Sequence, residues 1–381
     1  MKKTLIIIFI FITACTLTGC WNYKEVNDIW MVSGLAIDWD KQNEKYIISS
    51  EIIKPVNGEE GSITSEVITF DSYTIFDAMR KSISISGKKL YWSHCYVVII
   101  SESIAEKGIS SILDLISRSG EFRTNIVFIV SKEKTAKEIL EKKMKLFDIA
   151  SFQLDDMVKS YDKLSNSWNS EMWNFRKDYF DEGISPIMTA VRISENNEKF
   201  LPQIYGCGVF KEDKLIGYID NIEMESLLLV RNSLKGGDIP IKNMDNTKTA
   251  ITLEILSSKT KLEPEIQGDD IAMNINIKLN VAMPELEVEE NIINEKDLAN
   301  LKDYTNGKIE EQILAFVLKC QTKLKCDILG YGKLIQKKEP SKWKMLEKNW
   351  DEEFQTVKTN VNVETNIISS YRLYKTITAG D

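Results

Sequence analysis

The clearest pattern in the chain is an alternation of apolar and polar positions in its last third. Apolar residues occupy every second position from Ile271 to Met283, and asparagine or lysine stands at most of the positions between them. The segment from Val357 to Ile367 repeats this period of two. Such a period predicts long strands with one face on a core and one face in water, which is typical of an antiparallel sheet.

A helical stripe separates these two strand segments. The region from about Glu295 to Leu324 carries apolar residues at helical spacing, among them Ile309, Ile313, Phe316 and Val317. Such a helix would cover the apolar face of the sheet. We expect a shorter helix near residues 341–349, behind a proline. The last third is therefore predicted to be an α+β domain in which a long helix covers an antiparallel sheet.

The first half shows a different pattern. Residues 95–100 and 125–130 form almost unbroken apolar runs, which predict strands buried on both faces. Helical patterns follow them at about 104–118 and 135–146, and earlier strands are expected at 32–37 and 46–53. Behind Asp71 and Ser72, we expect a helix with Ile75, Phe76, Met79 and Ile83 on one face. This order predicts a mixed-sheet α/β domain.

The middle of the chain is less regular. Residues 203–210 and 215–219 predict a hairpin, and a short helix is expected around residues 224–230. The pattern divides the chain into a leader at residues 1–19, an N-terminal α/β domain at 20–195, a small middle domain at 196–250 and a C-terminal α+β domain at 251–381.

The leader has the anatomy of a secretory signal. Lys2 and Lys3 precede an apolar segment at residues 5–14, which is too short for a membrane span. The leader ends in Leu-Thr-Gly-Cys at residues 17–20, which resembles a bacterial lipobox; the alternative is an ordinary signal peptide with a chance cysteine. Under the lipobox interpretation, Cys20 becomes the lipid-modified N-terminus and tethers the rest of the chain to a membrane outside the cytoplasm.

Charge and cysteine content restrict the functional classes to which the protein can belong. The chain has 57 acidic and 49 basic residues, and this acidic balance argues against nucleic acid as a partner. Four cysteines follow Cys20 at scattered positions, which does not make a disulfide framework. A disulfide between Cys320 and Cys326 is not expected, although their spacing does not exclude it.

Candidate chemistry is sparse. The single histidine, His94, lacks partners at metal-ligand spacing and is expected to be a core or strand-end residue. The glycine pairs at 206–208 and 330–332 lack phosphate-loop context and are expected in strand ends or turns. Trp168 and Trp173 could bind a glycan or partner helix if exposed, or pack between domains if buried; the second alternative is favoured. No catalytic, metal or cofactor signature emerges, so we expect a protein that is not an enzyme.

Several segments together resemble the Ger(x)C family, the lipoprotein C subunits of bacterial spore nutrient germinant receptors. They occur in family order over essentially the whole chain after the leader, although Asn22 stands where the family often has an acidic residue. The segments are residues 19–25, 94–102 with Gly108, Arg118 with 121–123, 202–217, 326–332, and Trp343, Trp350 and Phe354.

The resemblance implies a three-domain, non-catalytic protein on the outer face of the spore inner membrane. Its partners would be two polytopic receptor subunits, one of them similar to amino-acid transporters, and it would act in receptor assembly or signal coupling. Cys20 is the only functional residue that the motif carries over, as the lipidation site. A solute-binding lipoprotein of a transporter is the alternative, and it would need two similar α/β lobes around a cleft. A cell-wall hydrolase is a third, less favoured hypothesis.

Overall fold

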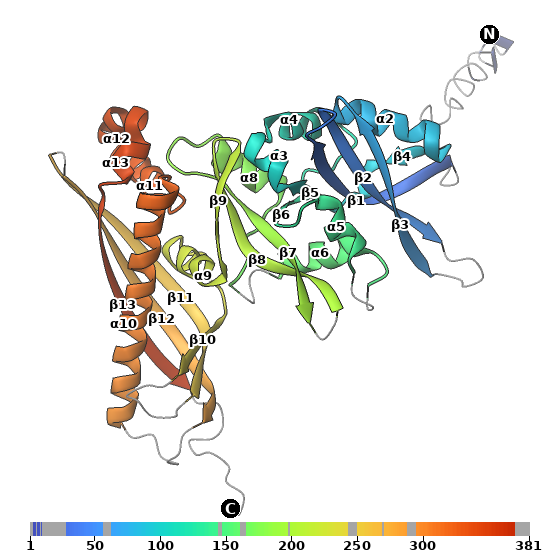
Figure 1. The fold of residues 1–381 in the computed structure, drawn as a ribbon. Coiled ribbons are helices and arrows are strands. Elements are labelled where there is room, and N and C mark those ends of the chain that lie inside the picture. The colour runs from blue at the N-terminus through green and yellow to red at the C-terminus, as the bar shows by residue number, and fades with distance from the viewer. Residues whose placement is uncertain are drawn as a thin grey trace, which may run out of the picture.

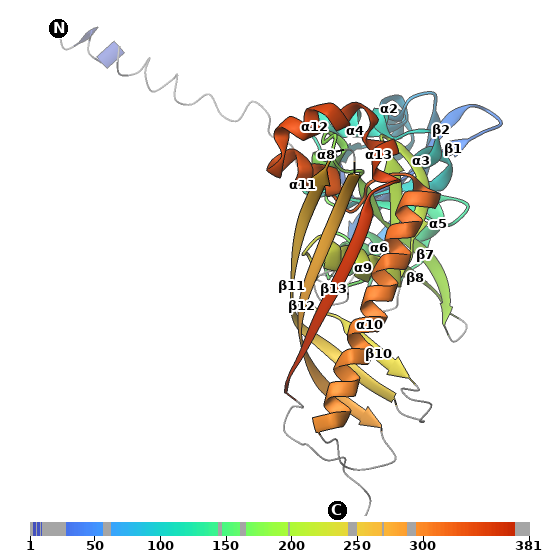
Figure 2. The ribbon, with the colours of Figure 1, turned by 90° about the vertical axis from the view of Figure 1, so that its left-hand side faces the viewer.

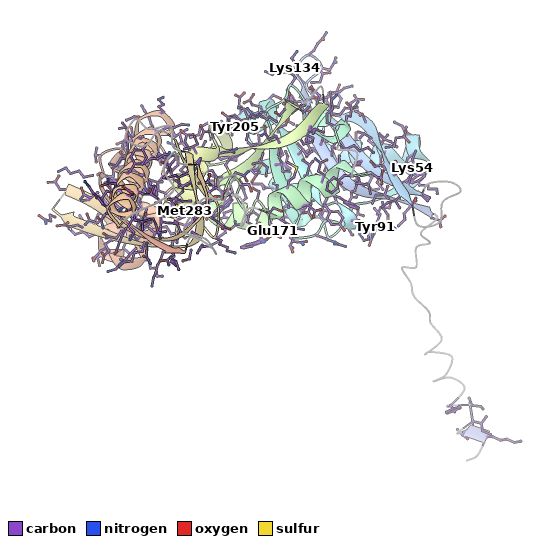
Figure 3. The ribbon with its side chains drawn as sticks, turned by 90° about the horizontal axis from the view of Figure 1, so that it is seen from below. Lys54, Tyr91, Lys134, Glu171, Tyr205 and Met283 are labelled. Carbon is purple, nitrogen blue, oxygen red and sulfur yellow. The ribbon has the colours of Figure 1, made fainter. Side chains whose placement is uncertain are left out.

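The computed structural model describes residues 28–55, 62–143, 147–160, 165–196, 199–242, 250–268, 270–287 and 295–369, together with residues 3, 4, 6, 7 and 9 of the leader. Two β-sheets lie one beyond the other in an elongated molecule, with helix α9 (Asn221–Val230) between them (Figure 1). Figure 3 shows Lys54 and Tyr91 in the large sheet's unit and Met283 in the second unit.

The large sheet has the order β3-β2-β1-β5-β6-β7-β8-β9, and β4 also pairs with β1. The neighbours from β1 to β7 in this order run parallel, whereas the strands at both edges are antiparallel. The predicted mixed sheet is therefore confirmed. Its strands are β1 (Ile29–Asp40), β2 (Lys45–Pro55), β3 (Ile63–Ser72), β4 (Lys89–Tyr91), β5 (Val97–Ser101), β6 (Val127–Ser131), β7 (Ile187–Asn196), β8 (Lys199–Lys211) and β9 (Lys214–Ile219).

Helices cover both faces of this sheet, which explains the continuous apolar runs. Every residue of β5 and of β6 is buried. One face packs against α2 (Ile75–Ser86), α3 (Glu102–Lys107), α4 (Ser110–Arg118) and α8 (Met172–Tyr179), and the other against α5 (Ala136–Glu141) and α6 (Ala150–Lys159). The single helix expected at 104–118 is two helices, because Gly108 has a positive φ of 126° at their junction.

Two buried carboxylates from the sheet hold the first turns of α5 and α6. Asp38 of β1 accepts the backbone N–H of Ala136 at 2.6 Å. Glu51 of β2 accepts those of Ala150 and Ser151 at 2.7 and 2.9 Å. A carboxylate near a helix N-terminus satisfies backbone donors that the helix itself cannot pair. The strands therefore supply these acceptors from far away in the sequence.

The predicted orientation of α2 is partly wrong. Ile75 and Met79 are buried as expected, but Phe76 is 52% exposed and Ile83 is 41% exposed. Small residues, Ala78 and Ser82, take the inner face instead. Close packing of the helix on the sheet needs small side chains at those positions, and a pattern of apolar residues alone does not reveal that.

The second sheet has the order β10-β11-β12-β13. Its long hairpin is antiparallel, as predicted, and the alternating apolar residues of β12 face the core. The prediction of a wholly antiparallel sheet is corrected at one edge, because β13 runs parallel to β12. The helices between these two strands return the chain to the end where β12 begins. The strands are β10 (Asp238–Lys242), β11 (Ala250–Gln267), β12 (Asp270–Glu287) and β13 (Lys358–Ser369).

The predicted long helix is confirmed as α10 (Glu295–Lys319), which lies along this sheet (Figure 2). It also covers the edge strand, because Glu310 accepts the backbone N–H of Val363 at 2.8 Å and Asn306 accepts that of Thr365 at 3.0 Å. Shorter elements follow it: the π-helical turn Cys320–Leu324, α11 (Tyr331–Lys338), α12 (Pro340–Leu346), the 3₁₀ turn Glu347–Asn349 and α13 (Trp350–Phe354).

The segment assigned to a small middle domain is divided between the two sheets. The predicted hairpin exists as β8 and β9, but it forms one edge of the large sheet. Helix α9 and β10 pack in the core of the second sheet, and this core continues onto Ile187, Cys207 and Val209 of the large sheet. Residues 196–250 therefore contribute no sheet of their own in the described part, while the domain boundaries stay a prediction.

Candidate functional site

The two units meet where the loop before β7 touches the first turn of α11 and the loop before it. The backbone N–H of Lys333 donates to Gly183 at 2.8 Å, and that of Ser185 donates to Asp327 at 2.7 Å. A side chain on Gly183 would collide with the backbone of Gly332 and Lys333. This glycine therefore permits a close backbone contact between the units.

Asp327 organises the second half of this junction. Its carboxylate, which is 1% exposed, accepts the backbone N–H groups of Leu329, Gly330 and Gly332 at 2.8–2.9 Å. It also accepts the indole N–H of Trp350 at 3.1 Å. Burial raises the pKa of Asp327, and these hydrogen bonds oppose the rise. The carboxylate thus fixes the turn that begins α11.

The predicted turn glycines at 330–332 have a geometric role here. Gly330 has a φ of 84° at the start of α11, a conformation that glycine adopts without strain. A side chain on Gly332 would collide with the indole of Trp350. The sequence prediction of a turn is therefore confirmed, and the tight turn explains why both glycines flank Tyr331.

A buried ion pair lies next to this turn. Arg231, directly after α9, bonds Asp178 of α8 at 3.3 Å, and both side chains are less than 10% exposed. Its Nε donates to the carbonyl of Ile328 at 2.8 Å, and its guanidinium carbon lies 4.9 Å from the ring centroid of Trp168. Arg231 therefore touches α8, the loop before α11 and the segment before α8 at once.

Two further links hold the units together. Lys319 of α10 bonds Glu223 of α9 at 2.6 Å and the carbonyl of Tyr218 at 3.0 Å. Lys211 of β8 pairs with Asp351 of α13 at 2.6 Å. With the shared apolar core, these contacts join the large sheet to the second sheet at several separate points.

A cleft of about 610 Å³ opens beside the ion pair, between α8, the turn after α9, β11 and α11. Side chains of both units line it, so the cleft belongs to the junction. Its lining residues are Trp168, Asn169, Asn174, Lys177, Asp178, Ile184, Arg231, Asn232, Ser233, Lys235, Leu262, Leu329, Gly330, Lys333, Leu334 and Lys337.

The two tryptophans considered in the sequence have different environments. Trp168 is half-buried and packs against the core of the second sheet, so the interdomain alternative is confirmed for it. Trp173 is 48% exposed, and its indole donates to Glu171 at 2.7 Å. The structure therefore does not bring them together as one cluster.

The other candidates from the sequence lie in a turn, in a strand or outside the described residues. His94 ends a short 3₁₀ turn beside Tyr91, with Arg123 3.4 Å from its Nδ1. The glycines around Cys207 are expected in a strand end or turn, but they lie inside β8. Cys20 and the lipobox lie outside the described residues.

The cysteines of the two units are buried thiols. Cys95, Cys207, Cys320 and Cys326 are all free in the structure. Burial raises the pKa of Cys207 and of Cys326 to about 12, so neither is an activated thiolate.

In the described part of the chain, histidine, cysteine and carboxylate side chains form no group that could hold a metal ion. Within the same residues, no helix combines the length and the apolarity needed to cross a membrane.

Comparison with known proteins identifies the family. The model "Spore germination protein N-terminal domain" matches residues 22–193, and "Spore germination B3/ GerAC like, C-terminal" matches residues 205–371. This protein therefore belongs to the Ger(x)C family of spore germination proteins.

Individual relatives agree with this family over nearly full length. Spore germination protein KC of Bacillus subtilis (strain 168) is 25% identical, covering 93% of this chain and 92% of its own. Spore germination protein B3 of the same organism is 23% identical, covering 97% of both chains. The crystal structure of the GerBC protein has the same fold, with a TM-score of 0.57 and 20% identity over 88% of this chain and 97% of that one.

Proposed function

We propose that this protein is a non-catalytic, lipid-anchored subunit of a spore germinant receptor, acting in receptor assembly and signal coupling. Membership of a spore germination family over both halves of the chain is the observation that carries the proposal. Curated relatives named as spore germination proteins match more than nine-tenths of the chain and support it.

The junction suggests how such a subunit would couple a signal. The core of the second sheet extends onto Ile187, Cys207 and Val209 of the large sheet, and polar contacts at Arg231 and Asp327 also join the two units. A displacement imposed on one sheet by a partner would therefore be transmitted to the other as a movement of packed elements. In this proposal the protein transmits a displacement from one sheet to the other, and this role requires no catalytic site.

The solute-binding alternative gains no support from the fold. It requires two similar α/β lobes, whereas the large sheet is mixed with helices on both faces and the second sheet has four described strands and a long helix along it. The partners in the proposal are two polytopic membrane subunits, and the location is the outer face of the spore inner membrane.

Lipidation at Cys20 is tested by the variant Cys20→Ala. Without an acylated thiol the chain lacks its anchor, because the acidic exterior gives anionic lipid headgroups no attraction. We expect the variant to leave the membrane fraction of spores and to impair nutrient-triggered germination. Cys95→Ala, which changes a buried thiol, serves as the matched control and should remain in the membrane fraction. Full membrane retention and normal germination of Cys20→Ala would contradict the anchor.

Receptor assembly is tested by affinity capture from detergent-solubilised spore membranes, followed by mass spectrometry. Recovery of two polytopic partners, one of them transporter-like, is the expected result. Recovery of ATP-driven permease subunits in their place would contradict the receptor proposal.

A further inference from the structure

The cleft at the junction has a charge opposite to that of the whole protein. Five cations and one carboxylate line it, although acidic residues outnumber basic ones in the chain: Lys177, Arg231, Lys235, Lys333, Lys337 and Asp178. Cations gathered in a partly enclosed space raise the local concentration of anions. The cleft is therefore suited to a negatively charged molecule.

Part of this positive charge is not used within the protein. Asp178 bonds Arg231, and Lys333 pairs with Asp181. By contrast, Lys177 and Lys337 take part in no ion pair among the residues that the structure describes. The charge of Asp178, the one carboxylate at the cleft, is thus already balanced by Arg231. The two unpaired lysines remain to bind another anion.

Arg231 gives a second, independent indication. Its side chain is 7% exposed, and its Nε and Nη1 have partners, but its Nη2 is buried without a hydrogen-bond partner. Buried donors are almost always paired in folded proteins, so an unpaired guanidinium nitrogen beside a cleft points to an absent acceptor. The planar guanidinium matches the two oxygens of a carboxylate.

The rest of the lining is apolar. The ring of Trp168 lies against Arg231, and Leu262, Leu329 and Leu334 line the cleft as well. A volume of about 610 Å³ lies in the range of small-molecule sites and is too small for a macromolecule. Charged and apolar surfaces together fit a molecule with one acidic end and an apolar body.

We propose that this cleft binds a small organic carboxylate whose apolar body packs against the tryptophan and leucines. Its carboxylate lies among Arg231, Lys177 and Lys337. Because α8 belongs to the large sheet's unit and α11 to the second unit, the bound carboxylate contacts both. Its binding therefore stabilises the junction in the arrangement seen here. This proposal stands independently of the receptor function, since it uses only the cleft.

The test uses the full-length protein in detergent at low ionic strength, with benzoate as the probe. Benzamide, which has the same ring and no charge, is the matched ligand control. Binding is measured by calorimetry and by tryptophan fluorescence. We expect saturable binding of benzoate and at least tenfold weaker binding of benzamide, because the site selects the negative charge.

Two lysine variants locate the site. Lys177→Gln and Lys337→Gln lie at the cleft rim and leave the buried ion pair intact, so both should fold. Each is expected to weaken benzoate binding about three- to tenfold, with added salt weakening it further. Lys41→Gln and Lys134→Gln change exposed lysines of the large sheet's unit and should leave binding unchanged; Figure 3 shows Lys134 far from the second unit.

Several results would overturn the proposal. They are equal binding of benzoate and benzamide, benzoate binding that neither cleft lysine affects, and no saturable binding up to about 50 mM, beyond the affinity expected for a ligand of this size. Tighter binding of inorganic phosphate than of benzoate, with the same lysine dependence, would exclude the carboxylate class.

Discussion

The guanidinium of Arg231 stacks on the indole of Trp168, with 4.9 Å between the guanidinium carbon and the ring centroid. The two residues come from different parts of the chain: Trp168 packs against the core of the second sheet, and Arg231 pairs with Asp178 of α8 in the large sheet's unit. A desolvated cation on an indole ring contributes about 2 kcal/mol beyond the apolar area that the ring buries. This pair is therefore a measurable part of the junction.

Replacement of Trp168 by leucine should destabilise the protein by about 2–3 kcal/mol, because both the ring packing and the cation–π contact are lost. Trp173→Leu is the matched control, since that ring is 48% exposed and bonds only Glu171 within the described residues. We expect it to change the free energy of unfolding by less than about 0.5 kcal/mol. Urea denaturation of both variants is the measurement, and equal effects would contradict the assignment of Trp168 to the junction.

Asp178→Asn should cost about 3 kcal/mol, because it removes the charge that compensates buried Arg231. The exposed pair of Lys45 and Asp71 provides a comparison, and Asp71→Asn should cost less than about 1 kcal/mol. Thermal and urea unfolding would measure both. A cost for Asp178→Asn no greater than that for Asp71→Asn would mean that the buried pair has no special role.

Asp327→Asn should destabilise the protein by about 2–3 kcal/mol. In asparagine, an NH2 group replaces one of the two carboxylate oxygens. A donor would then face either the N–H of Gly332 or the N–H groups of Leu329 and Gly330, which need an acceptor. Asp351→Asn, which changes a partly exposed acid in the same region, should have a small effect. Hydrogen exchange at the start of α11 would show whether the loss is local, and unchanged protection there would contradict the role of Asp327.

Glu51→Gln should destabilise α6, because one of the two oxygens that accept from Ala150 and Ser151 becomes a donor. We expect a loss of about 2 kcal/mol in the free energy of unfolding and faster hydrogen exchange in the first turn of α6. Glu66→Gln on the neighbouring strand changes an exposed side chain and is the control. Equal exchange in both variants would show that the cap is unimportant.

Glu225 should make stability depend on pH. Desolvation raises its pKa from 4.5 to about 7 in the folded state. Between these values the folded protein binds more protons than the unfolded chain, so stability falls as pH rises through this window. Glu225→Gln should remove the effect and gain about 3 kcal/mol relative to the native protein at pH 8, and almost nothing at pH 4.

Glu212→Gln, at an exposed turn residue, is the control for this titration. Urea unfolding at several pH values between 4 and 8 would measure both variants. A constant difference between Glu225→Gln and the native protein over this range would contradict the raised pKa.

The elements that could be predicted from the sequence are those in which local pattern and tertiary environment agree. The strand Val97–Ser101 is buried on both faces, and its continuous apolar run shows this directly. The strand Asp270–Glu287 faces a core on one side only, and its alternation shows that as well. In both strands, the pattern of apolar and polar residues within the strand is enough to predict which of its faces are buried.

The junction could not be predicted in the same way. Arg231 and Asp178 are 53 positions apart, and the residues around each of them do not indicate that the two form an ion pair. The one local signal was an arginine directly after the buried run Leu227–Val230, where a charge requires a partner. The direction of strand pairing could not be predicted either, because apolar and polar residues alternate in β13 in the same way beside a parallel as beside an antiparallel neighbour.

The parallel pairing of β12 with β13 also constrains how the chain folds. These strands are separated by α10 and all the short helices, so their pairing closes one of the longest loops in the protein. Such nonlocal pairing forms slowly, because the long loop must close before the contacts can form. Until then, the outer edge of β12 is an unpaired strand able to pair with another chain. We therefore expect the second unit to be the last part to fold, and its intermediate to be the species most prone to aggregation.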